Sequence, residues 1–148
     1  MSQLRVNLIH DSAKPPRREH DTDAGADIFY CPHDNKPVII LPQQTAVLET
    51  GIRVEVPSGH MLEVKNKSGI ASKRSLIVGA CVIDSGYDGQ VFVNLHNIGL
   101  SEQMIKPGDK LAQLVLIPIE TCDFVVTDAK LNDDSSRGEG GFGSTGDS

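Results

Sequence analysis

The sequence is divided into short apolar runs in which every second residue is polar. In GIRVEVP (residues 51–57) and QVFVNLH (residues 90–96), Ile, Val or Leu occupies alternate positions. A period of two is typical of a β-strand with one buried face. β-Branched residues are also concentrated in six further segments, which are KPVIILP, QTAVLET, HMLEVK, LIVGACVID, KLAQLVLIPIE and DFVVTD. The pattern predicts an all-β chain.

Turn-forming residues separate these runs, in PQQ, VPSGH, SGYDG and KPGD. Strands that recur at this spacing favour a jelly-roll-like β-sandwich or barrel. One short helix is expected in SGIASKRSL, with Ser68 as a possible N-cap.

The chain has 148 residues, which indicates one domain able to bury roughly 70% of its unfolded surface. From Leu131 onward the sequence is polar and rich in glycine, which is typical of a mobile segment. We therefore expect a β domain over residues 1–130 and a flexible arm over residues 131–148.

Several classes of protein are disfavoured by composition. No apolar run approaches the ~20 residues of a membrane span, and the N-terminal residues lack a secretory pattern. The three cysteines have no zinc-site spacing, so a cytoplasmic protein is expected. The net charge of −6 argues against nucleic acid, and binding of an anion would need local amides, cations or a metal.

The segment VGACVIDSGYDGQVFV predicts a β-hairpin whose turn begins at Asp84. Asp84 follows small and apolar residues, so it is a candidate general base, although turn aspartates commonly only satisfy nearby amides. Tyr87 lies in the same turn. Either its ring is a surface against which a ligand packs, or the residue has no role beyond completing the turn.

Three other segments contain candidate polar contacts. Lys67, Ser68 and Gly69 begin the predicted helix, where they form either an anion site or an ordinary capped helix. Gln113 interrupts an apolar strand and is either a core contact or a ligand contact. Asp27 lies among other aspartates in DTDAGADIFY, which is either a site for a hard cation or a solvated turn.

The arm contains RGEGGFGSTG, residues 137–146. It formally matches GxGxxG, but the strand and helix that a dinucleotide site requires are missing. The arm is either a disordered end or a lid that orders on a nucleotide. The second reading assigns phosphate contacts to Arg137 and the glycine amides, and base stacking to Phe142.

Five segments, in this order, resemble the five motifs of the trimeric deoxyuridine triphosphatases: DAGAD, KSGIA, GACVIDSGYDG, GDKLAQL and RGEGGFGSTG. The resemblance runs from about residue 23 to residue 146. It implies a jelly-roll homotrimer that hydrolyses dUTP to dUMP and pyrophosphate. Each active site would take the third motif from one chain, the second and fourth from a neighbour, and the arm from the third chain.

The resemblance also implies roles for the hairpin residues. Asp84 would activate the water that attacks the α-phosphorus, and Tyr87 would pack under the deoxyribose and exclude a 2′-hydroxyl. Uracil would be read by the hairpin backbone, formed by Cys81, Val82, Ile83 and Phe92.

The remaining motifs match positions that bind the triphosphate. Asp27 would support Mg²⁺ through water, and Phe142 would stack on the uracil. Phosphate contacts are implied for Lys67, Ser68, Gly69, Gln113, Arg137, Gly143, Ser144 and Thr145.

The chain departs from the family pattern at three places. Asn66-Lys67 replaces the usual Pro-Arg, Cys81 replaces a glycine, and Ser85-Gly86 stands where a second acidic residue is common. Lysine keeps the charge of arginine but not its two-pronged geometry. We expect activity to survive these changes and Lys67→Arg to be tolerated.

Three alternatives are considered: a dCTP deaminase-like enzyme on the same fold, a nucleotide-binding regulator without catalysis, and a plain jelly-roll interaction module. The Asp-x-x-Tyr pair at Asp84 and the glycine-rich arm favour the deoxyuridine triphosphatase over all three.

Overall fold

The structure, a computed structural model, describes residues 3–132 and 134–146. Residues 1–2, 133 and 147–148, which belong to the predicted ranges 1–130 and 131–148, lie outside the described residues. The division into a β domain and an arm stays a prediction.

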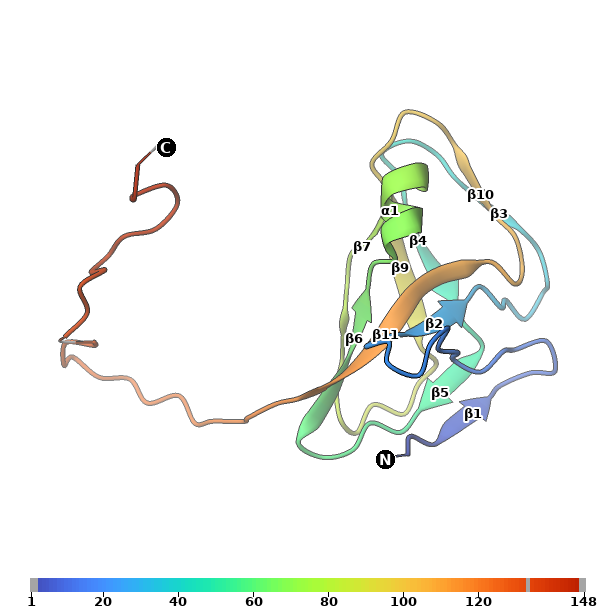
Figure 1. Ribbon diagram of the computed structural model, residues 1–148. Coiled ribbons are helices and arrows are strands. Elements are labelled where there is room, and N and C mark those ends of the chain that lie inside the picture. Colours follow the sequence, from blue (N-terminus) through green and yellow to red (C-terminus); the bar gives the residue numbers. More distant parts are fainter. Residues whose placement is uncertain (1–2, 133, 147–148) are drawn as a thin grey trace.

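Within the described residues the chain forms eleven short strands and one helix (Figure 1). In chain order they are β1 (Val6–Leu8), β2 (Ala26–Phe29), β3 (Val38–Ile40), β4 (Thr45–Glu49), β5 (Ile52–Val54), β6 (His60–Lys65), α1 (Ser68–Arg74), β7 (Leu76–Val78), β8 (Val82–Ile83), β9 (Phe92–Asn97), β10 (Gln103–Ile105) and β11 (Lys110–Pro118). The all-β class predicted from the period-two runs is confirmed.

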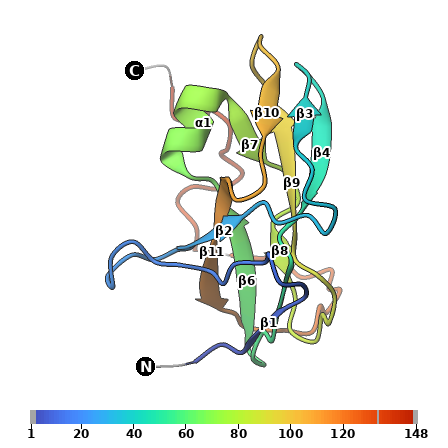
Figure 2. The same cartoon turned by 90° about the vertical axis from the view of Figure 1, so that its right-hand side faces the viewer.

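All strand pairings among the described residues are antiparallel. One sheet has the order β2-β11-β6-β8 and a second has the order β4-β9-β7, while β1-β5 and β10-β3 form separate pairs. In Figure 2, β2, β6 and β11 lie to one side of β4 and β9. This arrangement is the jelly-roll-like sandwich that the strand spacing predicts.

The core lies between the two larger sheets. In β9 and the residue before it, Val91, Val93 and Leu95 are each at most 1% exposed, as the alternation predicts. They belong to one hydrophobic cluster with Leu62 of β6 and Leu111 of β11. Burial of apolar surface, worth about 25 cal/mol per Å², therefore holds the two sheets together.

The segment LIVGACVID is divided into two strands, although its sequence predicts one. β7 pairs with β9, whereas β8 pairs with β6 in the other sheet. The chain crosses between the sheets at Gly79, where a Cβ would collide with the side chains of Asn94 and His96. The crossing point is thus in close contact with β9 and has no space for a side chain.

The segment DFVVTD is not a strand, although its residues favour one. After β11 ends at Pro118 the chain runs away from the sheets (Figure 1). Phe124, Val125 and Val126 are 94%, 82% and 96% exposed. β-Propensity depends on a neighbouring strand, and the described part of this chain provides none for this segment.

The predicted helix is confirmed, but the N-cap prediction is wrong. Ser68 is the first helical residue, and Lys67 occupies the N-cap position without a side-chain capping bond. Ser75 ends the helix in the left-handed conformation. The described residues include no helix with the length and hydrophobicity that a membrane crossing requires.

Candidate active site

The hairpin prediction is wrong in one respect: the expected turn joins β8 to β9, but these two strands do not pair with each other and belong to different sheets. β8 pairs only with β6 among the described strands, whereas β9 pairs with β4 and β7. A cavity of about 190 Å³ is lined by both arms of the hairpin and by β6. We call it the hairpin slot; its lining residues are Val64, Ala80, Cys81, Val82, Ile83, Asp84, Tyr87, Gln90, Val91 and Phe92.

Backbone groups of β8 are free to contact a ligand. The amide of Val64 donates to the carbonyl of Cys81 at 2.8 Å, and Glu63 faces Val82 in the register. Successive backbone groups of a strand point to opposite edges. The N–H and C=O of Val82 therefore point to the edge of β8 that β6 does not cover.

Asp84 lies at the end of β8, in the lining of the slot, and is exposed to water in the single chain. Its carbonyl accepts a hydrogen bond from the amide of Tyr87 at 3.2 Å, which closes the turn. The hydroxyl of Ser85 donates to the carbonyl of Val56 at 3.2 Å and ties the turn to the chain after β5. These contacts fix the backbone at Asp84, while its side chain lines the slot and is open to solvent.

Tyr87 folds back over its own turn. Its hydroxyl donates to the carbonyl of Gln90 at 2.8 Å. A Cβ at Gly89 would overlap the tyrosine hydroxyl and ring, so this position requires glycine if the ring is to keep its place. The ring is 46% exposed and presents a flat apolar surface beside Asp84.

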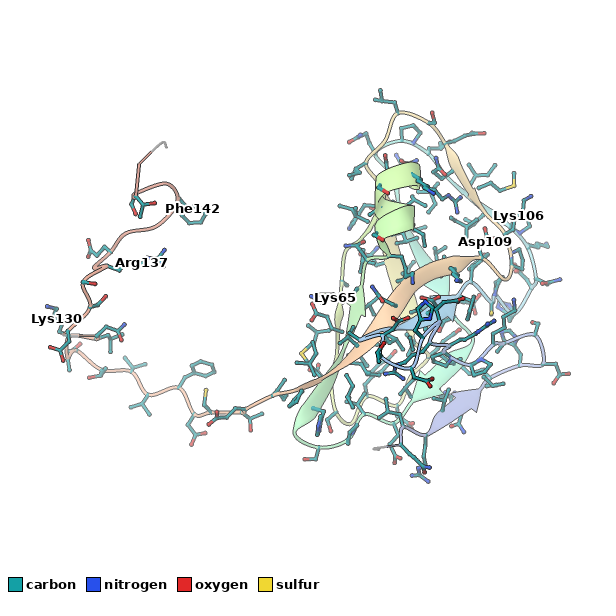
Figure 3. The ribbon with its side chains drawn as sticks, in the orientation of Figure 1. Lys65, Lys106, Asp109, Lys130, Arg137 and Phe142 are labelled. Atoms are coloured by element: carbon teal, nitrogen blue, oxygen red, sulfur yellow. The ribbon has the colours of Figure 1, made fainter. Side chains whose placement is uncertain are left out.

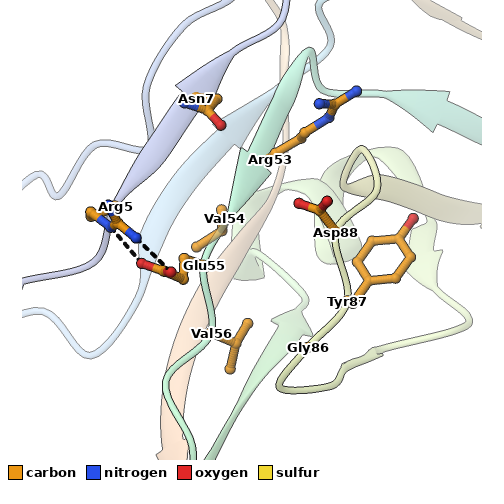
Figure 4. A pocket seen from close by; sticks show the side chains of 9 residues that line it. All are labelled: Arg5, Asn7, Arg53, Val54, Glu55, Val56, Gly86, Tyr87 and Asp88. Atoms are coloured by element: carbon orange, nitrogen blue, oxygen red, sulfur yellow. Dashed lines mark hydrogen bonds and ion pairs between the residues drawn. The ribbon is translucent and has the colours of Figure 1, made fainter.

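Tyr87 also borders a larger cavity of about 570 Å³ on the far side of the turn. Figure 4 shows Arg5 and Glu55 on one wall of this cavity, and Tyr87 and Asp88 on the other. The guanidinium of Arg5 donates to Glu55 at 2.7 Å. None of the residues that the resemblance assigns to phosphate lines this cavity.

A second group of predicted residues gathers around β11. Gln113 of β11 lies opposite Asp27 of β2 and opposite Lys65 of β6. Its side-chain amide donates to the carbonyl of Asn66 at 2.8 Å. β11 therefore brings the first, second and fourth motifs together.

Asp27 is 3% exposed and contacts two lysines. Its Oδ1 lies 2.6 Å from Nζ of Lys67, and its Oδ2 lies 3.1 Å from Nζ of Lys110. Burial by itself raises the pKa of Asp27, but the hydrogen bonds and charges of the two lysines outweigh it. The net effect lowers the pKa of Asp27, which stays ionised at neutral pH.

The arm lies away from both groups of residues. Figure 3 shows Arg137 and Phe142 at the far end of the extended segment that follows β11. Arg137 donates to the carbonyl of Gly140 within the arm at 2.8 Å, and the side chain of Phe142 is fully exposed. Asp27, Lys67, Lys110 and Gln113, which lie around β11, are called the β11 group. In a single chain the hairpin slot, the β11 group and the arm are thus three separate parts.

A metal ion would have few protein ligands here. The described residues contain no group of three or more His, Cys, Asp or Glu side chains suited to hold one. Mg²⁺ retains waters and is commonly bound by substrate phosphates with one or two carboxylates.

Sequence reasoning did not identify Lys110 or Gly25 as site residues. Lys110 occurs in the fourth motif, GDKLAQL, but its pairing with Asp27 depends on the register between β11 and β2. A Cβ at Gly25 would overlap the side chain of Gln113, so the glycine of the first motif makes room for it. The only signal in the sequence was the presence of both residues in the quoted motifs.

A family model described as dUTPase matches residues 11–146 of the chain, and this range includes all five motifs. The chain belongs to the dUTPase family. The resemblance read from the motifs is confirmed.

Curated dUTPases match most of the chain. The deoxyuridine 5′-triphosphate nucleotidohydrolase of Picosynechococcus sp. is 39% identical over 145 residues, which cover 97% of this chain and 98% of that protein. The protein of the same name from Chlamydia trachomatis is 40% identical over 126 residues, which cover 84% and 85%.

Solved dUTPase structures share the fold. The dUTPase of Staphylococcus bacteriophage 80alpha, solved with dUPNHPP, has 31% identity, covers 99% of each chain and gives a TM-score of 0.88. The dUTPase of phage phi11 of S. aureus, in which a structural Mg(II) ion is described, has 30% identity and a TM-score of 0.79, covering 87% of this chain and 99% of that chain.

These dUTPases establish the reaction class. The chain is a dUTP diphosphatase that hydrolyses dUTP, and dUTPases in general depend on a divalent metal. The deaminase-like and non-catalytic alternatives receive no support from these comparisons.

Proposed function

We propose that Asp84 is the general base for dUTP hydrolysis. It orients and deprotonates a water that attacks the α-phosphorus, so that dUMP and pyrophosphate are formed. The observation that carries this assignment is the position of the Asp84 carboxylate in the lining of the hairpin slot, beside Tyr87. A positioned carboxylate and a held phosphate chain suffice for this reaction without a covalent intermediate.

The hairpin slot binds the uracil. The free N–H and C=O of Val82 pair with the edge of the base as a neighbouring strand would, while Cys81, Ile83 and Phe92 enclose it. Cytosine presents the opposite donor and acceptor pattern and leaves polar groups unpaired, which disfavours it by up to ~10⁴-fold. A C5 methyl is excluded by size.

Tyr87 binds the deoxyribose. Its ring is fixed by the hydroxyl contact to Gln90 and by the missing side chain at Gly89. A sugar packed against this ring has no space for a 2′-hydroxyl, so the ring selects deoxyribose over ribose.

The phosphates are bound by neighbouring chains of a homotrimer. The β11 group and the described residues of the arm contribute nothing to the lining of the hairpin slot of their own chain, which supports sharing between chains. One neighbour supplies Lys67, Ser68, Gly69 and Gln113, and the other supplies its arm. In the arm, Phe142 stacks on the uracil, while the phosphate contacts are Arg137, Gly143, Ser144 and Thr145.

Mg²⁺ is the proposed cofactor. When bound, it would supply positive charge that offsets the charge of the phosphates. The support of Mg²⁺ through water that is expected of Asp27 stays a prediction, as does the cytoplasmic location.

A pyrophosphate-release assay with dUTP, dTTP, dCTP and UTP, with and without Mg²⁺, tests the proposal. We expect release from dUTP alone. Asp84→Asn should lower kcat by about 10²- to 10⁴-fold with little change in KM, because it removes the catalytic carboxylate but keeps the size and shape of the side chain. A chain that ends before Arg137 should also lose most of its activity.

Two outcomes would contradict these assignments. Full activity of the shortened chain would remove the arm from the site. Unchanged kcat in Asp84→Asn would exclude Asp84 as the base. Lys36→Met, which removes an exposed charge outside the site, serves as the control and should leave the rate unchanged.

A further inference from the structure

Asp27 is the only buried carboxylate among the described residues. Its two oxygens are divided between the ammonium groups of Lys67 and Lys110. The side chains of these lysines are 30% and 49% exposed, so each extends from solvent to the same buried acceptor. The arrangement differs from a surface ion pair, because one partner is inaccessible to water.

The backbone that carries Lys67 is also fixed. The carbonyl of Asn66 accepts from Gln113 at 2.8 Å, and its side-chain oxygen accepts from the amide of Val78 at 2.8 Å. The carbonyl of Lys67 accepts from Ala71 at 2.9 Å in the first turn of α1. Contacts at both ends therefore hold the Lys67 side chain, one at the backbone and one at the ammonium group.

A lysine needs such support more than an arginine does. The guanidinium group is rigid and forked, whereas the ammonium group is a point charge on a flexible four-carbon chain. Lys67 has three N–H donors, of which Asp27 uses one. The others are available to an oxygen on the solvent side.

We propose that Asp27 is a positioning residue that holds Lys67 and Lys110 in place as a preformed binding group for the triphosphate. This proposal rests on the function proposed above and adds Lys110 to the residues of the site. Two lysines and one carboxylate leave a net charge of +1, so anchoring by Asp27 does not cancel the attraction for phosphate. Glu19, whose carboxylate lies 3.9 Å from Nζ of Lys110, is 55% exposed and offsets part of this charge from the solvent side.

A mutant cycle between Asp27 and the lysine pair tests this coupling. Asp27→Asn and Lys67→Met should each raise KM for dUTP and weaken inhibition by inorganic pyrophosphate by about 10- to 100-fold, the value of a hydrogen bond to a charged group. In a background that carries both Lys67→Met and Lys110→Met, Asp27→Asn should add less than about threefold, because both groups that it positions are gone.

Additive effects in this cycle would overturn the proposal. Binding of deoxyuridine, which lacks phosphates, should be the same in all of these proteins, and a parallel loss of deoxyuridine binding would reveal only a general structural defect. If Asp27→Asn does not fold, Lys110→Met provides the test, since it should also raise KM, and an unchanged KM would contradict the role of Lys110.

Two further measurements distinguish this proposal from a role of Asp27 in metal binding and from the general-base role of Asp84. At saturating dUTP, Asp27→Asn and Lys67→Met should change the Mg²⁺ concentration for half-maximal activity to the same extent. A large increase that is absent in Lys67→Met would assign Asp27 to the metal instead. The kcat of Asp84→Asn reports on the general base and does not depend on these lysines, so failure of one proposal is distinguishable from failure of the other.

Discussion

At the scale of the residue, the position of Tyr87 depends on an absent side chain. The ring occupies the space that a Cβ at Gly89 would take, and its hydroxyl is bonded to the carbonyl of Gln90. The proposed selection of deoxyribose by Tyr87 would therefore depend on two residues, although only one of them would contact the sugar.

Gly89→Ala should displace the ring and reduce the preference for dUTP over UTP by about tenfold, as measured by the ratio of their kcat/KM values. The same change in a Tyr87→Ala background should have no further effect on that ratio, since no ring remains to be displaced. An equal loss in both backgrounds would show that Gly89 acts through the backbone and not through Tyr87.

The residue types in a sequence do not by themselves show which side chains are in contact in the folded protein. Asp84 and Tyr87 are three positions apart in one turn, so their proximity follows from the sequence. Asp27 and Lys110 are brought together by the pairing of β2 with β11, which no local pattern specifies. For this reason the turn residues were predicted together, whereas the lysine pair on Asp27 was not.

At the scale of the element, β9 is the strand on which the sequence was most informative. Its alternation places Val93 and Leu95 in the core, and the structure confirms it. The apolar run LIVGACVID was misleading, because its composition does not show that the chain changes sheets at Gly79. The run DFVVTD has strand propensity but no partner in the described part of its own chain, and propensity does not identify a partner.

Leu95→Ala should lower the free energy of unfolding by about 2–5 kcal/mol, because Leu95 is 1% exposed and its removal leaves a cavity. Leu100, which follows β9 and is 96% exposed, provides the matched control. Leu100→Ala should change the free energy by less than about 0.5 kcal/mol in the same urea titration. Equal effects would indicate that the β9 face is not part of the core.

At the scale of the whole molecule, the proposed site has no complete set of parts in one chain. The slot, the β11 group and the arm are separate, and the arm extends away from the body (Figure 1). Sharing of sites between chains therefore predicts that two inactive proteins complement each other.

Asp84→Asn, with an intact arm, should be unfolded and refolded together with a chain that ends before Arg137. In a random 1:1 mixture about a quarter of the sites would combine an intact Asp84 with an intact arm, if three equivalent chains form a ring. We expect pyrophosphate release to recover accordingly. Mixtures no more active than their separate components would exclude shared sites.

The open hairpin links substrate choice to the interior of the protein. Because each wall of the slot belongs to a different sheet, the side chains packed between the sheets determine the distance between the walls. Val64 belongs both to the hydrophobic core and to the lining of the slot. If the slot binds uracil as proposed, substitutions that enlarge the core, even where they touch no nucleotide, would spread the walls and admit thymine. Fidelity towards the base would then be partly a property of hydrophobic packing.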